Sequence, residues 1–198
     1  GTNASFEEKA LTLEEGATSQ PVAKAEVKGT WKKEGNVVKQ TSWEEGTVLL
    51  NNKLFTSDEY TYKVRARKDK GHEGFLVVFN YVDEDNYCWL NLGGWGNGQH
   101  AIEQVIDGSK AQIAMTPGRV EEGRWYDVEL HVKGDSVYTS IDGKQIFAAK
   151  LKPSTFANFF SSATYDEASG EYIVKLVNTS TEATTARINL KNHKSSKG

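Results

Sequence analysis

The stretch YTYKVRARK, residues 60–68, carries the pattern that decides the fold. Apolar and polar residues alternate along it: the apolar set is Tyr60, Tyr62, Val64 and Ala66, and the polar set is Thr61, Lys63, Arg65 and Arg67. A period of two places the apolar side chains on one face of an extended strand and the polar side chains on the other. The stretch therefore predicts a β-strand with one buried and one solvent-facing side.

Two further stretches extend this interpretation. In WYDVELHV, residues 125–132, the predicted inward side chains are Tyr126, Val128, Leu130 and Val132. The turn sequences Lys133-Gly134-Asp135 and Asp142-Gly143-Lys144 follow, so residues 129–147 predict a three-strand meander. The stretch GFLVVFNYV, residues 74–82, is almost continuously apolar, which predicts a strand covered on both faces.

Helical periodicity is nearly absent. The best helix candidate, residues 6–13, is short and could equally be a strand. In the last quarter, residues 167–170 form a turn sequence between SSATY and EYIVKLVN. Many short strands separated by tight turns predict an all-β fold, an antiparallel sandwich or jelly roll.

Composition limits the function classes. The chain has 198 residues and a formal net charge of −3, with no basic stripe of the kind that nucleic acid requires. No apolar run approaches the roughly 18 residues of a membrane span, and no signal peptide is visible. Cys88 is the only cysteine, which excludes a disulfide framework, and its place in a strand-like run predicts a buried, unreactive thiol.

The stretch NYCWLNLGGWGNGQHAIEQ, residues 86–104, is the strongest candidate for a binding site. Aromatic rings can stack on the C–H faces of sugars, while amide, imidazole and carboxylate groups pair with hydroxyls. We expect Trp89 and Trp95 to stack, and the polar partners to be Asn91, Asn97, Gln99, His100 and Glu103. The alternative is a structural corner, because tryptophans often fill sandwich cores and glycines often form bulges and turns.

Other chemistry is less well supported. Asp127 and Glu129 share a predicted solvent face with His131, so we expect them to be solvated rather than catalytic. Asp83, Asp85 and Asn86 supply oxygen atoms of the kind that calcium prefers, but a complete site needs six or more, so they remain a weak calcium candidate. The four histidines show no metal-binding spacing, and no cofactor is expected.

Longer stretches resemble a known family. Residues 73–104 (EGFLVVFNYVDEDNYCWLNLGGWGNGQHAIEQ) and 120–147 (VEEGRWYDVELHVKGDSVYTSIDGKQIF) resemble the concanavalin-like jelly-roll module of many glycoside hydrolase family 51 α-L-arabinofuranosidases. Residues 159–190 (FFSSATYDEASGEYIVKLVNTSTEATTARINL) are similar to the carboxy-terminal β-sandwich of the same enzymes. The two stretches occur in an order that fits one parent protein.

The resemblance implies a domain division. Residues 1–21 would be an amino-terminal strand segment packing with the carboxy-terminal portion, residues 22–152 the jelly roll, and residues 153–198 part of the appended β-sandwich. Pro153 marks the second boundary, because proline cannot continue a central strand.

The resemblance also implies a function. Those enzymes catalyse on a TIM barrel with two glutamates, and this sequence shows no strand–helix alternation of a barrel. It also lacks the Glu-x-Asp-x-x-Glu pattern of related jelly-roll glucanases. The resemblance thus implies a non-catalytic accessory region, secreted or periplasmic, that binds plant polysaccharide or arabino-oligosaccharide and neighbours the parent's catalytic barrel. The alternative is a structural module that packs between domains and binds no sugar.

Overall fold

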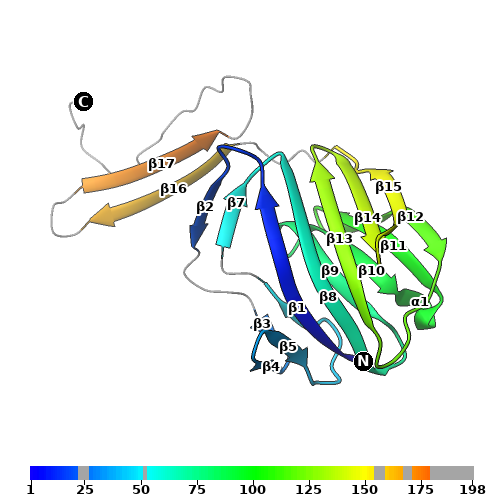
Figure 1. The fold of residues 1–198 in the computed structure, drawn as a ribbon. Helices are drawn as coiled ribbons and strands as arrows, with labels where there is room; N and C mark the ends of the chain where they lie inside the picture. The colour runs from blue at the N-terminus through cyan, green and yellow to red at the C-terminus, as the bar shows by residue number, and fades with distance from the viewer. Residues whose placement is uncertain (22–26, 51–52, 154–158, 167–170, 179–198) are drawn as a thin grey trace. The chain divides into compact units, whose positions relative to one another are not determined.

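The computed structural model describes residues 1–21, 27–50, 53–153, 159–166 and 171–178 (Figure 1). The chain forms two compact units, Gly1–Ser154 and Thr155–Gly198. Among the described residues, no helix has the length and apolar character needed to cross a membrane. The first unit carries both large sheets and all the candidate site residues.

The larger sheet of the first unit has seven strands in the order β15-β14-β13-β8-β1-β5-β4. Their bounds are Thr2–Leu13 (β1), Trp31–Glu34 (β4), Val37–Gln40 (β5), Glu59–Gly71 (β8), Trp125–Lys133 (β13), Ser136–Ile141 (β14) and Lys144–Lys150 (β15). All neighbouring strands are antiparallel. The predicted meander over residues 129–147 is confirmed as β13, β14 and β15.

The smaller sheet has four strands in the order β12-β11-β10-β9, also antiparallel. Their bounds are Phe75–Asp83 (β9), Asn86–Gly93 (β10), Gln99–Ile106 (β11) and Ser109–Pro117 (β12). The segment α1, Gly94–Asn97, joins β10 to β11. It is a tight turn rather than a regular helix, because Trp95 and Gly96 both have positive φ angles, 49° and 67°.

Three two-stranded ribbons complete the described structure. In the first unit, β2 (Thr18–Pro21) pairs with β7 (Lys53–Thr56), and β3 (Val27–Lys28) pairs with β6 (Val48–Leu49). In the second unit, β16 (Phe159–Asp166) pairs with β17 (Glu171–Asn178) as predicted; the connecting turn, residues 167–170, lies outside the described residues. Membership of this hairpin in a larger sandwich stays a prediction.

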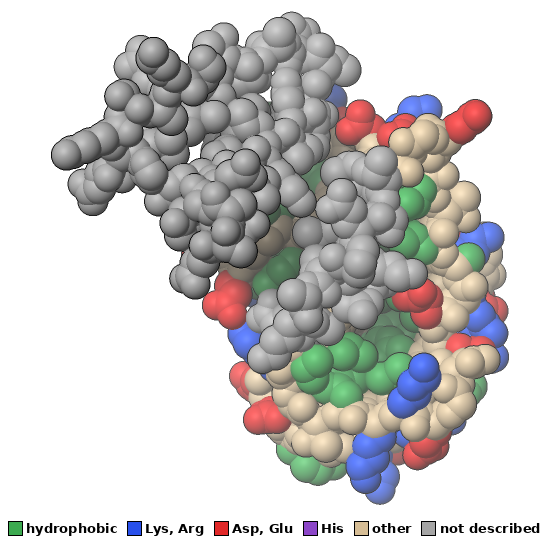
Figure 2. Space-filling model, turned by 90° about the vertical axis from the view of Figure 1, so that its left-hand side faces the viewer, with side chains coloured by type: hydrophobic (Ala, Val, Ile, Leu, Met, Phe, Trp, Pro, Cys, Tyr) green, Lys and Arg blue, Asp and Glu red, His purple; other side chains and the backbone are tan. Residues whose placement is uncertain are grey.

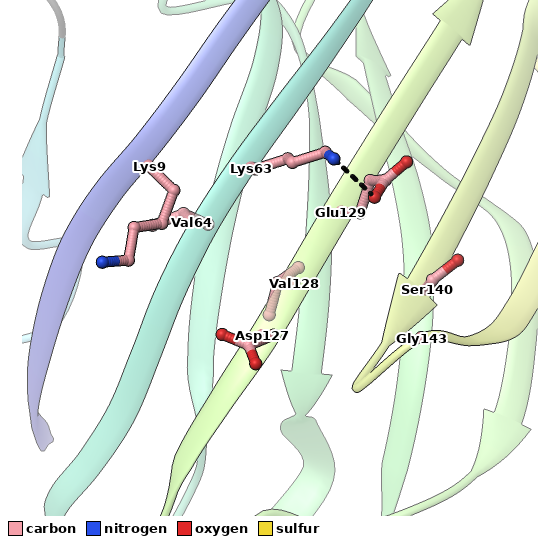
Figure 3. A pocket seen from close by; sticks show the side chains of 8 residues that line it. All are labelled: Lys9, Lys63, Val64, Asp127, Val128, Glu129, Ser140 and Gly143. Carbon is pink, nitrogen blue, oxygen red and sulfur yellow. Dashed lines mark ion pairs between the residues drawn. The ribbon is translucent and has the colours of Figure 1, made fainter.

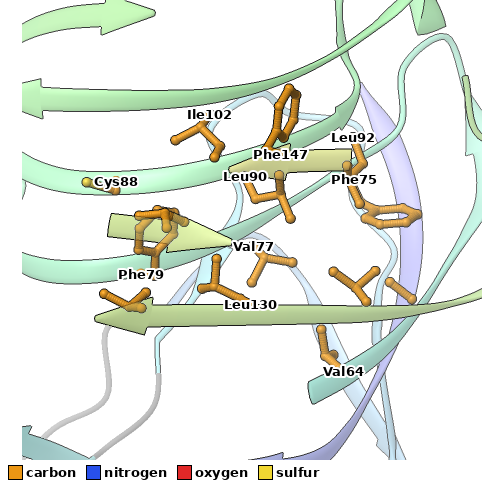
Figure 4. Close-up of a cluster of buried hydrophobic side chains, with 14 of the residues drawn as sticks. Val64, Phe75, Val77, Phe79, Cys88, Leu90, Leu92, Ile102, Leu130 and Phe147 are labelled. Atoms are coloured by element: carbon orange, nitrogen blue, oxygen red, sulfur yellow. The ribbon is translucent and has the colours of Figure 1, made fainter. Parts of the chain in front are cut away.

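The core lies between the two large sheets. Figure 4 shows side chains from both layers meeting there, with Leu90, Leu92 and Ile102 from the smaller sheet and Val64 and Leu130 from the larger one. These five side chains are at most 4% exposed. Burying a side chain of this size stabilises the fold by about 1.5–3 kcal/mol relative to exposure, so the apolar alternation in the sequence supplies the main stabilisation of the sandwich.

The predicted alternation is confirmed in β8 and β13. Ala66 and Val128 are buried, and their polar neighbours face outward. The fold class is likewise confirmed: the described residues form an all-β structure, with antiparallel sheets arranged as a sandwich. The prediction for β9 was wrong, because only one of its faces is covered. Phe75, Val77 and Phe79 are buried, whereas Leu76 on the other face is 38% exposed.

The amino-terminal strand is part of the seven-stranded sheet, where β1 pairs with β5 and β8. Packing of residues 1–21 with the carboxy-terminal portion stays a prediction. Two bulges, at Asn3/Ala4 and Glu8/Ala10, break its apolar alternation and so concealed its membership of the sheet. Phe6 nevertheless packs on the core, with its ring 5.9 Å from that of Phe75.

Some apolar side chains remain at the surface of the first unit. Figure 2 shows hydrophobic side chains gathered on one face, with charged side chains around them. Val27 on β3, Leu49 on β6 and Trp43 are between 40% and 56% exposed. Apolar atoms make up much of the surface of any folded domain, so exposure alone assigns these residues no site.

Candidate functional site

The candidate site divides between two places, the outer face of the four-stranded sheet and the corner around α1. On β10, Cys88, Leu90 and Leu92 enter the core, so Tyr87, Trp89 and Asn91 project from the opposite face. The register pairs Trp89 with Glu103 on β11 and with Val78 on β9. We call the outer surface formed by Tyr87, Trp89, Asn91 and Glu103 the Trp89 face.

The indole of Trp89 is held in a fixed orientation. Its Nε1–H donates to Glu103 Oε2 at 2.5 Å, and its ring lies 5.3 Å from the ring of Tyr87. Tyr87 in turn stacks on Tyr81, with ring centroids 6.2 Å apart. Three aromatic side chains therefore form a continuous row on rigid strands, and the indole is anchored at its polar edge.

Electrostatics at the Trp89 face combine one buried carboxylate with one exposed ammonium. Glu103 is 6% exposed. The pKa of the Tyr87 hydroxyl is raised mainly by burial of that hydroxyl, and secondly by the charge of Glu103. The ammonium of Lys110, on the neighbouring strand β12, lies 4.4 Å from the centre of the Trp89 ring. An exposed cation–π contact is worth about 0.5–1 kcal/mol, so a ligand that stacks on this ring can displace Lys110 at small cost.

Two of the predicted site residues have structural roles at the corner around α1. Asn97 bonds the backbone of Val120 twice at 2.8 Å, donating through Nδ2 and accepting through Oδ1. His100 is 7% exposed, and its Nδ1 accepts the Gly93 N–H at 3.0 Å. Burial lowers the pKa of His100. Both side chains are therefore committed to holding the corner together.

The environments of Trp95 and Gln99 differ from those of Asn97 and His100. Trp95 is 48% exposed at the tip of the turn, where Glu73 accepts the N–H of Gly96. The side-chain amide oxygen of Gln99, Oε1, is buried without a hydrogen-bond partner. A buried acceptor left unpaired costs about 1–3 kcal/mol, so a hydroxyl donor that reached Gln99 would find an available acceptor.

The structure thus brings Trp89, Asn91 and Glu103 together, with Trp95 at the adjoining corner. The binding residues predicted from the sequence did not include Tyr87, although its alternation with Trp89 places it on the same face. Nor did they include Lys110, for which the sequence carries no signal, because only the β11–β12 register places it on the indole.

The calcium candidates lie in the β9–β10 turn. Asp83 Oδ1 accepts the Asp85 N–H at 2.9 Å and the Asn86 amide at 2.8 Å, while Asn86 Oδ1 accepts the Asp107 N–H at 2.7 Å. These bonds give Asp83 and Asn86 roles in shaping the turn. Across the described ranges, no group of three or more His, Cys, Asp or Glu side chains is arranged to hold a metal ion.

Asp127 and Glu129 project from the opposite layer, on the outer face of β13. Their side chains are 73% and 46% exposed, and they pair with Arg65 at 3.3 Å and Lys63 at 3.6 Å, respectively. Cys88 is 3% exposed, and burial raises the pKa of its thiol to about 12. A thiol in this state is almost never ionised near neutral pH, which is consistent with a structural role.

Comparison with known proteins relates the chain to part of a glycosidase. It is 37% identical over 160 residues to an extracellular exo-α-L-arabinofuranosidase of Streptomyces chartreusis, a match that covers 80% of this chain and 19% of that protein. It is 29% identical over 86 residues to sex hormone-binding globulin of Phodopus sungorus, covering 43% of this chain and 21% of that protein. The chain spans about a fifth of the length of these relatives.

These similarities define a class for the fold: an all-β sandwich of the concanavalin-like type, related to a region of an arabinofuranosidase. The similarity to the globulin agrees with a sandwich of this type. No family model matches the chain, and no solved structure matches it significantly.

Proposed function

We propose that this chain is a non-catalytic accessory region of a larger α-L-arabinofuranosidase and that it binds arabinose-containing plant polysaccharide through the Trp89 face. A match that covers 80% of this chain relates it to part of an extracellular exo-α-L-arabinofuranosidase. This match supports the proposal that the chain belongs to a larger enzyme of that kind. It also supports an extracellular location, and a catalytic domain as the neighbour of this region in the same polypeptide.

The observation that carries the binding proposal is the anchored indole of Trp89. Its N–H bonds a buried carboxylate and its ring adjoins that of Tyr87. A ring fixed in this way loses little conformational freedom on binding, and preorganisation of this kind improves affinity. Asn91 projects from the same face and supplies amide donors and an acceptor for sugar hydroxyls.

The carboxylates described above favour binding over catalysis. A glycosidase needs a protonated acid beside a second carboxylate, about 5–5.5 Å apart in retaining enzymes and about 6.5–9.5 Å apart in inverting ones. Glu103 is held by the Trp89 indole, whereas Asp127 and Glu129 are solvent-exposed and ion-paired on the other layer. We therefore assign bond cleavage to the part of the parent enzyme outside this chain.

A second candidate function is domain packing without sugar binding. Leu76 and Met115 are each 38% exposed on the outer side of the four-stranded sheet, in line with Asn91 and Ala101 across the strands. Exposed apolar side chains on an outer sheet face suit contact with another domain. The internal bonds of Asn97 and His100 fit the same interpretation, because those side chains are unavailable to a ligand.

Calorimetric titration with arabino-oligosaccharides separates the two candidates. We expect binding by the wild-type chain and a loss of about tenfold in affinity for Trp89→Ala, equivalent to about 1.4 kcal/mol. Trp43→Ala is the matched control, because Trp43 is 56% exposed and lies outside the Trp89 face. Absence of binding to arabinan and arabinoxylan fragments would leave the packing function, and release of reducing sugar by the purified chain would contradict the non-catalytic assignment.

A further inference from the structure

The outer face of the seven-stranded sheet has a shallow hollow on the layer opposite the Trp89 face. Strands β1, β8, β13 and β14 contribute to it, and the four-stranded sheet lies behind them in the view of Figure 3. The charged and hydroxyl side chains that line it are those of Lys9, Lys63, Asp127, Glu129 and Ser140. We infer that this hollow is a second saccharide-binding surface, for a neutral, hydroxyl-rich chain, independent of Trp89.

The strand register gives the hollow an ordered set of polar groups. Lys63, Glu129 and Ser140 lie in one row across β8, β13 and β14, and Lys63 Nζ is 3.6 Å from Glu129 Oε2 (Figure 3). The next row pairs Arg65 with Asp127, at 3.3 Å. Because these side chains project from central strands, their spacing is fixed by backbone hydrogen bonds rather than by loops.

These polar groups are available to a ligand. The side chains of Lys63, Glu129 and Asp127 are 54%, 46% and 73% exposed, respectively. Ion pairs between exposed side chains contribute little net stability, because water solvates the separated partners well. A ligand can therefore replace them with its own hydrogen bonds, while the strands keep the groups in position.

Aromatic side chains lie on both sides of these rows. Tyr138, 40% exposed, precedes Ser140 by two residues on β14 and contacts His131, with ring centroids 5.9 Å apart. Trp125 precedes Asp127 by two residues on β13, and two arginine side chains lie over its ring. Residues two apart share a face of a strand, so rings flank the polar groups and can contact the C–H faces of a bound sugar.

The charges of the hollow identify the ligand class. The hollow and the side chains paired with it carry equal numbers of cations and anions, so there is no net charge: Lys9, Lys63 and Arg65 against Glu7, Asp127 and Glu129. A phosphate or carboxylate would meet two aspartate or glutamate side chains, and a cation would meet two lysines. Hydroxyl groups both donate and accept, so a neutral saccharide can satisfy the ammonium and carboxylate groups at once.

Titration of the full chain with neutral arabino- and xylo-oligosaccharides tests this inference. We expect the double variant Lys63→Ala/Glu129→Ala to lower affinity at this surface by about tenfold, because hydrogen bonds to charged groups contribute more than neutral ones. Lys133→Ala is the matched control, since Lys133 is an exposed lysine of β13 outside the hollow. Chemical-shift changes at Ser140 and Tyr138 that persist in Trp89→Ala would support independence from Trp89.

The outcomes separate this inference from the proposed function. Binding that is lost in Trp89→Ala and unchanged in the double variant would overturn the second surface and leave the Trp89 face intact. Binding that is lost only in the double variant would support the second surface alone. Tighter binding of uronate-containing oligosaccharides than of neutral ones at the hollow would contradict the assigned ligand class, and absence of saccharide binding would overturn both surfaces.

Discussion

Gly74 lies where the backbone of the four-stranded sheet leaves no room for a side chain. Its N–H donates to the Gly93 carbonyl at 2.7 Å, and a Cβ added at Gly74 would lie 1.8 Å from the Leu92 carbonyl oxygen. We expect Gly74→Ala to lower the free energy of unfolding by about 1–3 kcal/mol or more, as overpacking does. Gly98→Ala is the matched control, because its nearest neighbour would be 3.4 Å away. Urea unfolding measures both, and equal stabilities would contradict the packing.

Cys88 illustrates how burial controls reactivity. With its pKa raised to about 12, the thiol is almost never ionised at pH 8, and thiolate is the reactive form. We expect a thiol reagent such as dithionitrobenzoate to modify Cys88 only after unfolding in denaturant. Rapid modification of the native chain at pH 8 would show that the β10 core face opens far more often than its burial implies.

His100 makes stability depend on pH. Burial lowers its pKa below the ordinary value of 6.5, so the unfolded chain takes up a proton more readily than the folded chain. The stabilisation is complete above pH 6.5 and is lost as the pH falls from there through the folded pKa. We expect His100→Gln to flatten this part of the pH profile of the free energy of unfolding. His72→Gln, at an exposed histidine, serves as the control substitution.

At the scale of elements, Asn97 joins the turn α1 to the loop before β13. Its two bonds to Val120 are between a side chain and the backbone, and Val120 is 1% exposed. We expect Asn97→Ala to destabilise the fold by about 2–4 kcal/mol, because it leaves a buried N–H and C=O unpaired. Asn36→Ala, at an exposed turn between β4 and β5, should change stability by less than about 0.5 kcal/mol. Similar thermal denaturation of the two variants would contradict the role assigned to Asn97.

The strands that could be predicted are those whose side chains face a different environment on each side. β8 and β13 carry a clear period of two, because one face meets the core and the other meets water. β9 does not show this alternation: its outward Leu76 and Val78 are apolar, so its sequence suggested that both faces are covered. β1 concealed its place in the sheet through two bulges, which shift the period without ending the strand.

The candidate site was predictable only in part, for a similar reason. Alternation along β10 identified Trp89 and Asn91 as outward, and their cross-strand partner Glu103 came from the same stretch. Asn97 and His100 are polar residues of the same sequence stretch, but their tertiary contacts with Val120 and Gly93 decide their role. The hollow of the seven-stranded sheet combines four strands distant in sequence, so no local motif signals it.

At the scale of the whole molecule, the chain combines a rigid sandwich with polar and aromatic surfaces on both outer faces of its first unit. The apolar residues of the alternating strands meet in one core, which leaves the outward positions free to vary with function. The related arabinofuranosidase is about five times longer than the matched region, so most of that polypeptide lies beyond the similarity. We propose that this sandwich recognises saccharide and that cleavage belongs to the remainder of the parent.

The indole N–H signals of the five tryptophans, followed by NMR during titration with arabino-oligosaccharide, test this assignment most directly. Tryptophan-to-phenylalanine variants assign each signal. We expect the Trp89 signal to shift in a saturable manner, since its N–H bonds Glu103 within the Trp89 face, and the Trp43 signal to stay in place. A Trp89 signal that remains unmoved at saturating ligand would contradict binding of saccharide at the Trp89 face.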